Sequence, residues 1–229
     1  MSGVIFWDFD GTLAHRPGMW GACMVETLDE HEPGHAFTLD VVKPLLEDGF
    51  PWHAPQTPHP ELCEGDAWWE HVGGLLARAY EGLGLSRERS VELALLTRAR
   101  YVDALVGWTV FDDTVPALER LRAHGWRHVV LSNHVPELPQ LVDRLGLGEL
   151  FDAVLTSAAT GYEKPHPEMF ALALRAAGAH AHTWMVGDNY DADVVGAESA
   201  GIPAVLVRRD DERAARRAET LDELDRFIL

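Results

Sequence analysis

Cysteine is scarce in this chain of 229 residues, which contains only Cys23 and Cys63. Two cysteines without a CxxC spacing exclude a disulfide framework and give no support to a structural zinc site. Long hydrophobic runs are also missing, because no stretch approaches the roughly 18 consecutive apolar residues that span a bilayer. No basic segment precedes the first apolar run, so we expect a cytoplasmic protein with no export signal and no membrane partner.

Positively charged residues are also scarce. The chain has 19 lysine and arginine residues against 37 aspartate and glutamate residues, a formal net charge of −18. Such a chain repels polyanions and lacks a basic surface that could displace their counterions, so we expect no nucleic-acid partner. Lys43 and Lys164 are the only lysines, which makes the position of each one informative.

Apolar residues make up 47% of the chain, enough for a full hydrophobic core. The continuous apolar run at residues 4–7 is typical of a parallel strand that is covered on both faces. From residue 113 onward, strand-like and helix-like segments alternate. This alternation predicts the α/β class with a doubly wound parallel sheet. The expected strands are 127–131, 153–156, 183–186 and 204–207, and the expected helices are 113–124, 136–145, 167–177 and 192–200.

Residues 15–110 break this rhythm, because an ordinary crossover between parallel strands needs only about 30 residues. Apolar side chains recur there at helical spacing in three places. We therefore expect a small helical bundle, a cap, inserted into a core made of residues 1–14 and 111–229. A proline-rich ordered loop is expected at 51–60, and a solvated loop or helix face at 208–219. The three helical patterns are Trp20, Cys23, Met24 and Leu28; Trp69, Val72, Leu76 and Tyr80; and Val91, Leu95, Val102 and Val106.

Polar residues follow the predicted strands at the points where these strands end. Asp8 and Asp10 are two positions apart, so both side chains point to one side while Phe9 points away. The ligand crevice of an open α/β sheet lies beyond the carboxyl ends of its strands. We therefore expect polar groups from several strand ends to converge on one crevice, namely Asp8, Asp10, Ser132, Asn133, Lys164, Asp188 and Asp193.

This ordered set resembles the four motifs of the haloacid dehalogenase-like hydrolase superfamily. The motifs stand here as Asp8-Phe9-Asp10-Gly11-Thr12, Ser132-Asn133, Lys164-Pro165 and Gly187-Asp188 with Asp193. The resemblance covers residues 3–207 and implies a Rossmann-like core, and the position of the insert is similar to that of a C1-type helical cap. It implies a magnesium-dependent phosphatase that acts on a small phosphorylated metabolite.

The resemblance also implies roles for the motif residues. Asp8 is implied as the nucleophile that forms an aspartyl phosphate, and Asp10 as the general acid and base, which requires a raised pKa. A hard divalent cation is needed to bring a phosphate ester to these carboxylates, and Mg²⁺ is the implied cofactor. Its implied ligands are the carboxylates of Asp8 and Asp188 and the backbone carbonyl of Asp10. Asp193 and Thr12 are expected to support this site from behind.

Phosphoryl oxygens need hydrogen-bond donors and positive charge. The expected donors are the Ser132 hydroxyl, the Lys164 ammonium and the backbone N–H groups of Gly11 and Asn133. His15 and Arg16 stand at the start of the insert, where we expect them to contribute to substrate specificity. Both a monomer and a homodimer are compatible with the sequence.

Four other functions use similar residues. A phosphomutase keeps both aspartates and a helical cap, so it is the principal alternative. A dehalogenase of this family lacks the second aspartate of the first motif, which argues against that activity. A receiver-type signalling domain is about half as long and has no cap, and a non-catalytic binding protein is expected to have lost at least one motif residue.

Overall fold

Six parallel strands form the central sheet of the computed structural model, which describes residues 3–178 and 182–229. Their spatial order is β5-β4-β1-β6-β7-β8, so the first strand of the chain lies between strands from two later segments. Trp7 at the end of β1 is paired with Val130 of β4 and Val186 of β6. The strands are β1 (Gly3–Trp7), β4 (Trp126–Ser132), β5 (Ala153–Thr156), β6 (His182–Gly187), β7 (Ala204–Val207) and β8 (Arg217–Ala218).

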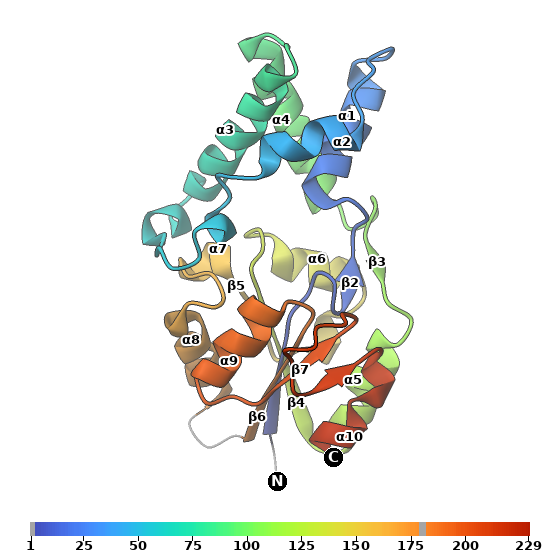
Figure 1. Ribbon diagram of the computed structural model, residues 1–229, viewed down its shortest axis with the longest axis vertical. Coiled ribbons are helices and arrows are strands. Elements are labelled where there is room, and N and C mark those ends of the chain that lie inside the picture. Colours follow the sequence, from blue (N-terminus) through green and yellow to red (C-terminus); the bar gives the residue numbers. More distant parts are fainter. Residues whose placement is uncertain (1–2, 179–181) are drawn as a thin grey trace.

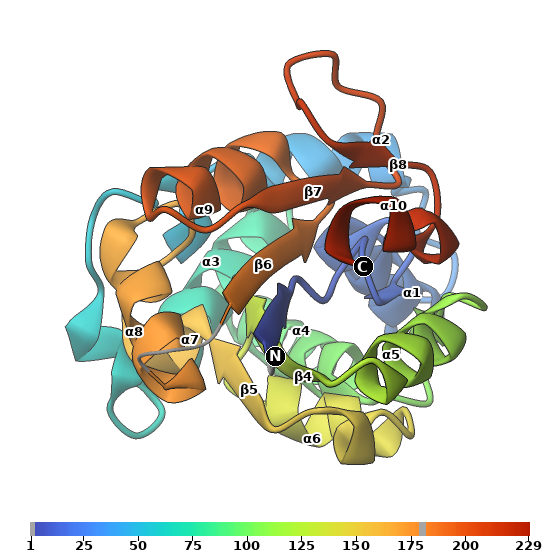
Figure 2. The same cartoon turned by 90° about the horizontal axis from the view of Figure 1, so that it is seen from below.

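The two faces of β1 carry alternating apolar side chains, as the period of an extended strand requires. Val4 and Phe6 belong to one buried cluster, and Ile5 and Trp7 to another. Helices cover both faces (Figure 2), which confirms the predicted doubly wound sheet. The helices of the first face are α8 (Pro167–Ala177) and α9 (Gly196–Ser199), and those of the second are α5 (Thr114–Ala123), α6 (Leu138–Arg144) and α10 (Asp225–Ile228).

The strand order reverses at β1. The chain adds β4 and β5 on one side of this strand and then places β6, β7 and β8 on the other side. Ligands of open α/β sheets bind outside the carboxyl ends of the strands at such a switch point. The ends of β1, β4 and β6 are therefore the place to look for a site.

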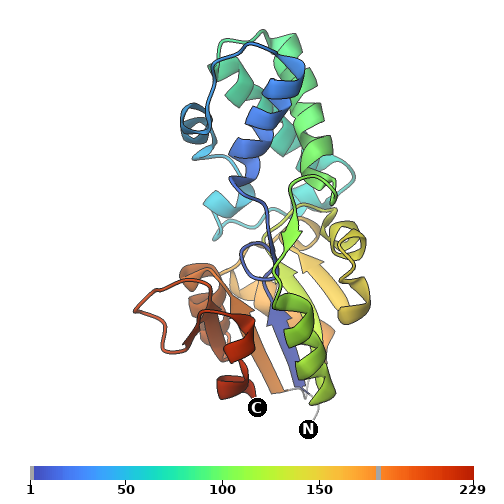
Figure 3. The same ribbon diagram turned by 90° about the vertical axis from the view of Figure 1, so that its right-hand side faces the viewer.

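A group of helices, residues 16–108, lies above this end of the sheet and is called the helical insert below (Figure 1). Two short antiparallel strands, β2 (Ala14–His15) and β3 (Thr109–Val110), join it to the sheet domain (Figure 3). Within the insert α4 packs along both α1 and α3. Its elements are α1 (Met19–His31), α2 (Leu39–Val42), η1 (Lys43–Leu46), η2 (Pro51–His53), η3 (Pro60–Cys63), α3 (Ala67–Gly82) and α4 (Arg87–Val102).

The buried face of α4 differs from the predicted one. Val91 and Leu95 were expected to face inward, yet their side chains are 48% and 61% exposed. Leu93, Thr97 and Tyr101 are buried instead. A polar residue can take this inward position because the Thr97 hydroxyl is 2.7 Å from the Tyr80 hydroxyl and donates to a backbone carbonyl.

The segment 208–219 is not simply the solvated loop or helix face that its mixed charge predicts. Arg217 and Ala218 form the edge strand β8, which pairs with β7. Arg208 stacks its guanidinium 3.7 Å from the centre of the Phe111 ring and donates to Asp113 over 2.5 Å. Among the described residues, no helix is long and apolar enough to cross a membrane.

Candidate active site

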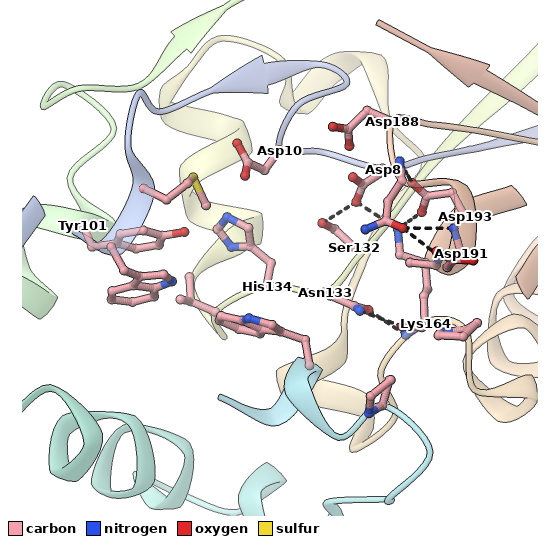
Figure 4. Close-up of a pocket in the computed structure, with 18 residues that line it drawn as sticks. Asp8, Asp10, Tyr101, Ser132, Asn133, His134, Lys164, Asp188, Asp191 and Asp193 are labelled. Carbon is pink, nitrogen blue, oxygen red and sulfur yellow. Dashed lines mark hydrogen bonds and ion pairs between the residues drawn. The ribbon is translucent and has the colours of Figure 1, made fainter. Parts of the chain in front are cut away.

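Carboxylates from two strand ends converge above the sheet (Figure 4). Asp8 and Asp10 follow β1, Asp188 follows β6, and Asp193 lies one turn later in the π-helical segment η5 (Tyr190–Val195). Asp8, Asp188 and Asp193 each place an oxygen atom within 4.8 Å of those of the other two. Phe9 points away and packs against Trp108, as the alternation along an extended strand predicts.

Lys164 is the cation at this cluster, and its side chain is buried. The ammonium donates to Oδ1 of Asp8 over 2.9 Å and to Oδ1 of Asp193 over 2.5 Å. Burial lowers the pKa of Lys164, but the two carboxylates outweigh it and raise the pKa above its usual range. The side chain therefore stays charged near neutral pH.

The residues at the end of β4 hold these groups in place. Ser132 donates its hydroxyl to Oδ1 of Asp8 over 2.7 Å. The Asn133 amide accepts from the backbone N–H of Lys164 over 2.7 Å and donates to the carbonyl of the same residue over 2.9 Å. This pair of hydrogen bonds fixes the loop that carries Lys164, so the Asn133 side chain positions the lysine.

Both carboxylate oxygens of Asp193 are already engaged. Oδ1 accepts from Lys164, and Oδ2 accepts from the backbone N–H of Asn189 over 3.0 Å. The Asn189 side chain in turn caps η5 by accepting from the N–H groups of Asp191 and Ala192. With both oxygens engaged in this way, Asp193 is suited to supporting the cluster from behind.

The pKa of Asp10 is raised to about 8, first by burial and then by the charges of Asp8 and Asp188. The pKa of Asp188 is raised to about 6 by burial and by Asp8, while Arg209 opposes the shift by donating to it over 3.2 Å. Negative charge is thus in excess at this cluster. Hard carboxylate oxygens in such excess suit a hard divalent cation such as Mg²⁺.

Two glycines make room for the carboxylates. A Cβ atom on Gly11, whose φ is 80°, would lie 2.4 Å from Oδ2 of Asp188. A Cβ atom on Gly187 would lie 2.1 Å from Oδ2 of Asp193. The backbone N–H of Gly11 donates to the Ala14 carbonyl over 2.8 Å. Gly11 was predicted to bind phosphate through this N–H, and the structure instead gives it the role of admitting Asp188.

A cavity of about 570 Å³ opens over the cluster and continues beneath the helical insert. Its floor is formed by the polar residues that end the strands. Its other walls come from the insert and from the segment after β4, in particular Met19, Trp20, Trp52, Tyr101 and His134.

Similarity to known proteins shows which family the chain belongs to. The family model described as haloacid dehalogenase-like hydrolase matches residues 3–201. The chain belongs to this family. The resemblance seen in its four motifs and the expectation of a hydrolase are thereby confirmed.

Relatives of this haloacid dehalogenase-like hydrolase match most of the chain. Haloacid dehalogenase-like hydrolase domain-containing protein 3 of Homo sapiens is 41% identical over 217 residues, which are 89% of this chain and 81% of the human protein. Phosphoglycolate phosphatase of Rhodospirillum rubrum is 30% identical over 218 residues, 90% of this chain and 80% of that protein. Some other curated relatives match over about half of their length or less.

The fold is also shared with solved structures. The 2-haloacid dehalogenase of Pseudomonas syringae superposes with a TM-score of 0.70 at 24% identity, covering 99% of this chain and 97% of that one. At this level of identity the likeness shows the fold alone.

Four residues that were expected at the site of this hydrolase do not line the cavity, namely Gly11, Thr12, His15 and Arg16. Arg16 is buried and donates to the Val106 carbonyl and, over 2.6 Å, to Glu26. The His15 ring packs 4.7 Å from that of Phe111. Both residues therefore stabilise the segments that join the insert to the sheet domain. Thr12 was expected to support the site from behind; it is fully buried, and its hydroxyl has no hydrogen-bond partner among the described residues, so it gives that support through no hydrogen bond of its side chain.

Sequence reasoning missed most of the cavity wall. Trp20 was assigned to the core from its helical spacing, yet it lies both in the core and on the cavity. Trp68 and Trp69 are both buried and do not line the cavity. For His134 the sequence did contain an indication that it lies near the site, namely its position two residues after Ser132.

Proposed function

We propose that the protein is a magnesium-dependent phosphatase that hydrolyses a small phosphorylated metabolite through an aspartyl phosphate on Asp8. The observation that carries this proposal is the position of the Asp8 carboxylate. It lies at the floor of the cavity, with Oδ1 held by Lys164 and Ser132 and with Asp10 and Asp188 beside it. Relatives named as phosphatases support the same class of reaction.

Three residues are proposed to hold the metal ion. They are Asp8 and Asp188 through their carboxylates and Asp10 through its backbone carbonyl. When bound, Mg²⁺ neutralises the carboxylates and makes the approach of a phosphate dianion favourable. Asp193 is proposed to position Lys164, because both of its oxygens accept hydrogen bonds from other groups.

In the first step an oxygen of Asp8 attacks phosphorus, and the bond from phosphorus to the leaving oxygen breaks. The Asp10 carboxyl donates its proton to the departing alkoxide, which leaves as an alcohol. In the second step Asp10, now a carboxylate, takes a proton from water as the water oxygen attacks phosphorus, and the bond from phosphorus to the Asp8 oxygen breaks. Inorganic phosphate departs, and both aspartates return to their starting states.

The direction of the pKa shift at Asp10 fits the acid role, because burial, the largest cause of the shift, favours the protonated carboxyl. Ser132 and Lys164 are proposed to bind phosphoryl oxygens, together with the backbone N–H of Asn133. The helical insert is proposed to be the cap of residues 15–110, which closes over the leaving group and excludes water.

Phosphate release from a panel of phosphate monoesters, with Mg²⁺ or with EDTA, tests the proposal. Wild type is expected to release phosphate only with Mg²⁺, and Asp8→Asn is expected to release none. Asp222→Asn is a matched control, because Asp222 is an exposed carboxylate paired with Arg120 outside the cavity. Release by Asp8→Asn at the wild-type rate, with deamidation ruled out, contradicts the mechanism.

The same assay separates a phosphatase from a phosphomutase. A mutase transfers the phosphoryl group to a second alcohol, so it yields a rearranged ester instead of free phosphate. Analysis of the products from a sugar phosphate therefore decides between the two activities.

A further inference from the structure

The cavity wall opposite the carboxylates is aromatic. Trp20 and Tyr101 stack with ring centres 3.6 Å apart and an angle of 4° between their planes. Trp52 stacks on Phe50 at 4.5 Å and presents a half-buried side chain to the same cavity. These three rings belong to the helical insert, and Figure 4 shows Tyr101 across the cavity from Asp188. An alcohol that leaves a phosphoryl group at Asp8 meets these rings.

Positive charge is missing from this wall. Among the described residues that line the cavity, Lys164 is the only lysine or arginine, and it is already paired with Asp8 and Asp193. Five aspartates line the same cavity. An anionic group on the alcohol would lose its hydration here without gaining a free cation, which is unfavourable.

Arg209 is the nearest alternative cation, since it bonds Asp188. Its side chain is exposed and lies in a neighbouring depression. Asp191, Asp210 and Asp211 line that depression, so negative charge exceeds positive charge there as well.

His134 adds a polar feature to the aromatic wall. Its side chain is buried, and neither ring nitrogen has a hydrogen-bond partner among the described residues. Burial lowers the pKa of His134 to about 4, so the ring is neutral and offers one N–H donor and one acceptor. Phe9, Tyr101 and Trp108 surround the ring, and Figure 4 shows it between Asp10 and Tyr101. An unpaired polar group in such surroundings is costly. Both nitrogens are covered in this structure, so a ligand hydroxyl removes that cost only when the ring turns toward the cavity that it lines.

We propose that the substrate is a phosphate monoester of an uncharged alcohol that carries an aromatic ring. Trp20, Trp52 and Tyr101 select the ring, and His134 bonds a polar substituent on it. Alcohols that carry a carboxylate or a second phosphate are rejected. This proposal rests on the proposed phosphatase activity. The proposed substrate differs from that in the name of the Rhodospirillum rubrum relative, phosphoglycolate, an ester with a carboxylate on its leaving group.

Benzyl phosphate and 4-carboxybenzyl phosphate form a matched pair for the first test, with phosphoglycolate and methyl phosphate as further substrates. We expect kcat/KM for benzyl phosphate to exceed each of the others by about tenfold or more, since an unpaired charge or a missing ring each costs binding energy. Equal or faster turnover of 4-carboxybenzyl phosphate or phosphoglycolate overturns the proposal.

Two substitutions test the residues. Trp52→Ala is expected to raise KM for benzyl phosphate by about tenfold and to leave that for methyl phosphate unchanged, because only the first ester carries a ring. Phe37→Ala is the matched control, since Phe37 is a half-buried aromatic residue of the insert that does not line the cavity. An equal change of KM for both esters in Trp52→Ala contradicts the assignment of this wall.

The three hydroxybenzyl phosphates test His134. At least one isomer is expected to be preferred over benzyl phosphate, to lose this preference in His134→Leu and to keep part of it in His134→Gln. No preference for any isomer in wild type overturns the role of His134.

If wild type hydrolyses no monoester with Mg²⁺, the phosphatase proposal itself fails. If phosphate is released but carboxylate-bearing esters react fastest, only the present proposal fails.

Discussion

The Lys164 ammonium donates a hydrogen bond to Oδ1 of Asp8 over 2.9 Å, although the two residues stand 156 positions apart in the chain. The pair forms because β1 occupies the centre of the sheet, so that loops from both halves reach its carboxyl end. Asp193 shares the same ammonium. The buried lysine therefore serves two carboxylates, and its removal leaves both without a counter-charge.

Lys164→Met is expected to destabilise the fold by about 3 kcal/mol, because it leaves buried carboxylates unpaired. It is also expected to abolish phosphate release. Urea unfolding and the release assay measure the two effects. The double variant Lys164→Met with Asp193→Asn is expected to recover part of the stability and none of the activity. Wild-type activity in the single variant contradicts the role given to this ammonium.

Gly11→Ala is expected to abolish activity, because the added Cβ atom falls 2.4 Å from the Asp188 carboxylate. Gly201→Ala is a close control, since Gly201 has a similar φ of 77° and open space around it. Both variants are expected to lose roughly 1 kcal/mol of stability to backbone strain. Phosphate release and thermal unfolding separate the two effects. Equal activity of the two variants shows that the close approach to Asp188 is unimportant.

His128 predicts a loss of stability in acid. Its Nδ1 lies 3.1 Å from the Trp7 indole nitrogen, which donates to it, while Nε2 faces the Leu118 carbonyl at 3.0 Å. The first contact needs the neutral ring, because Nδ1 must be unprotonated to accept from Trp7, whereas Nε2–H donates to the Leu118 carbonyl in either state. Burial lowers the pKa of His128 from 6.5 to about 4, so the unfolded chain binds more protons between these values. Stability from this group is complete above pH 6.5 and is lost as the pH falls toward 4.

The size of this loss is about 3 kcal/mol for His128, at about 1.4 kcal/mol for each unit of pKa. Urea unfolding at several pH values measures it. His128→Gln is expected to flatten the slope between pH 6.5 and 4, whereas His124→Gln, at an exposed site, is expected to leave it unchanged. The buried His134 adds a slope of the same sign that remains in both variants. An unchanged slope in His128→Gln contradicts the assignment.

Arg16→Met tests whether this residue braces the insert or selects the substrate. Because its guanidinium bonds Glu26 and the Val106 carbonyl, we expect a loss of about 2 kcal/mol in stability. The ranking of substrates in the phosphate-release panel is expected to stay the same. A changed ranking at unchanged stability restores the specificity role that the sequence suggested.

Local pattern and chemical resemblance predicted the sheet domain well. The strands at 153–156 and 204–207 and the helix at 167–177 begin and end as expected, because each is an apolar or amphipathic run with clear boundaries. The convergence of Asp8, Lys164 and Asp188 also followed from the rule that parallel strands end at one edge.

The helical insert was harder to predict, because its packing depends on contacts between distant residues. Val91 and Leu95 have the spacing of a buried face, yet Thr97 takes the inward position through its bond to Tyr80. The cavity wall has the same origin. Trp52 and Tyr101 reach it only through the way that the insert sits above the sheet, which no local pattern encodes.

The most direct test of the central claim is to find the phosphoryl group on the protein. Asp10→Asn is incubated with Mg²⁺ and 4-nitrophenyl phosphate, whose leaving group needs no proton, and is quenched in acid. Peptide mass mapping is expected to locate an acyl phosphate on Asp8, because the variant lacks the base for the second step. A phosphoryl group on another residue, or phosphate release by Asp8→Asn at the wild-type rate, contradicts the account.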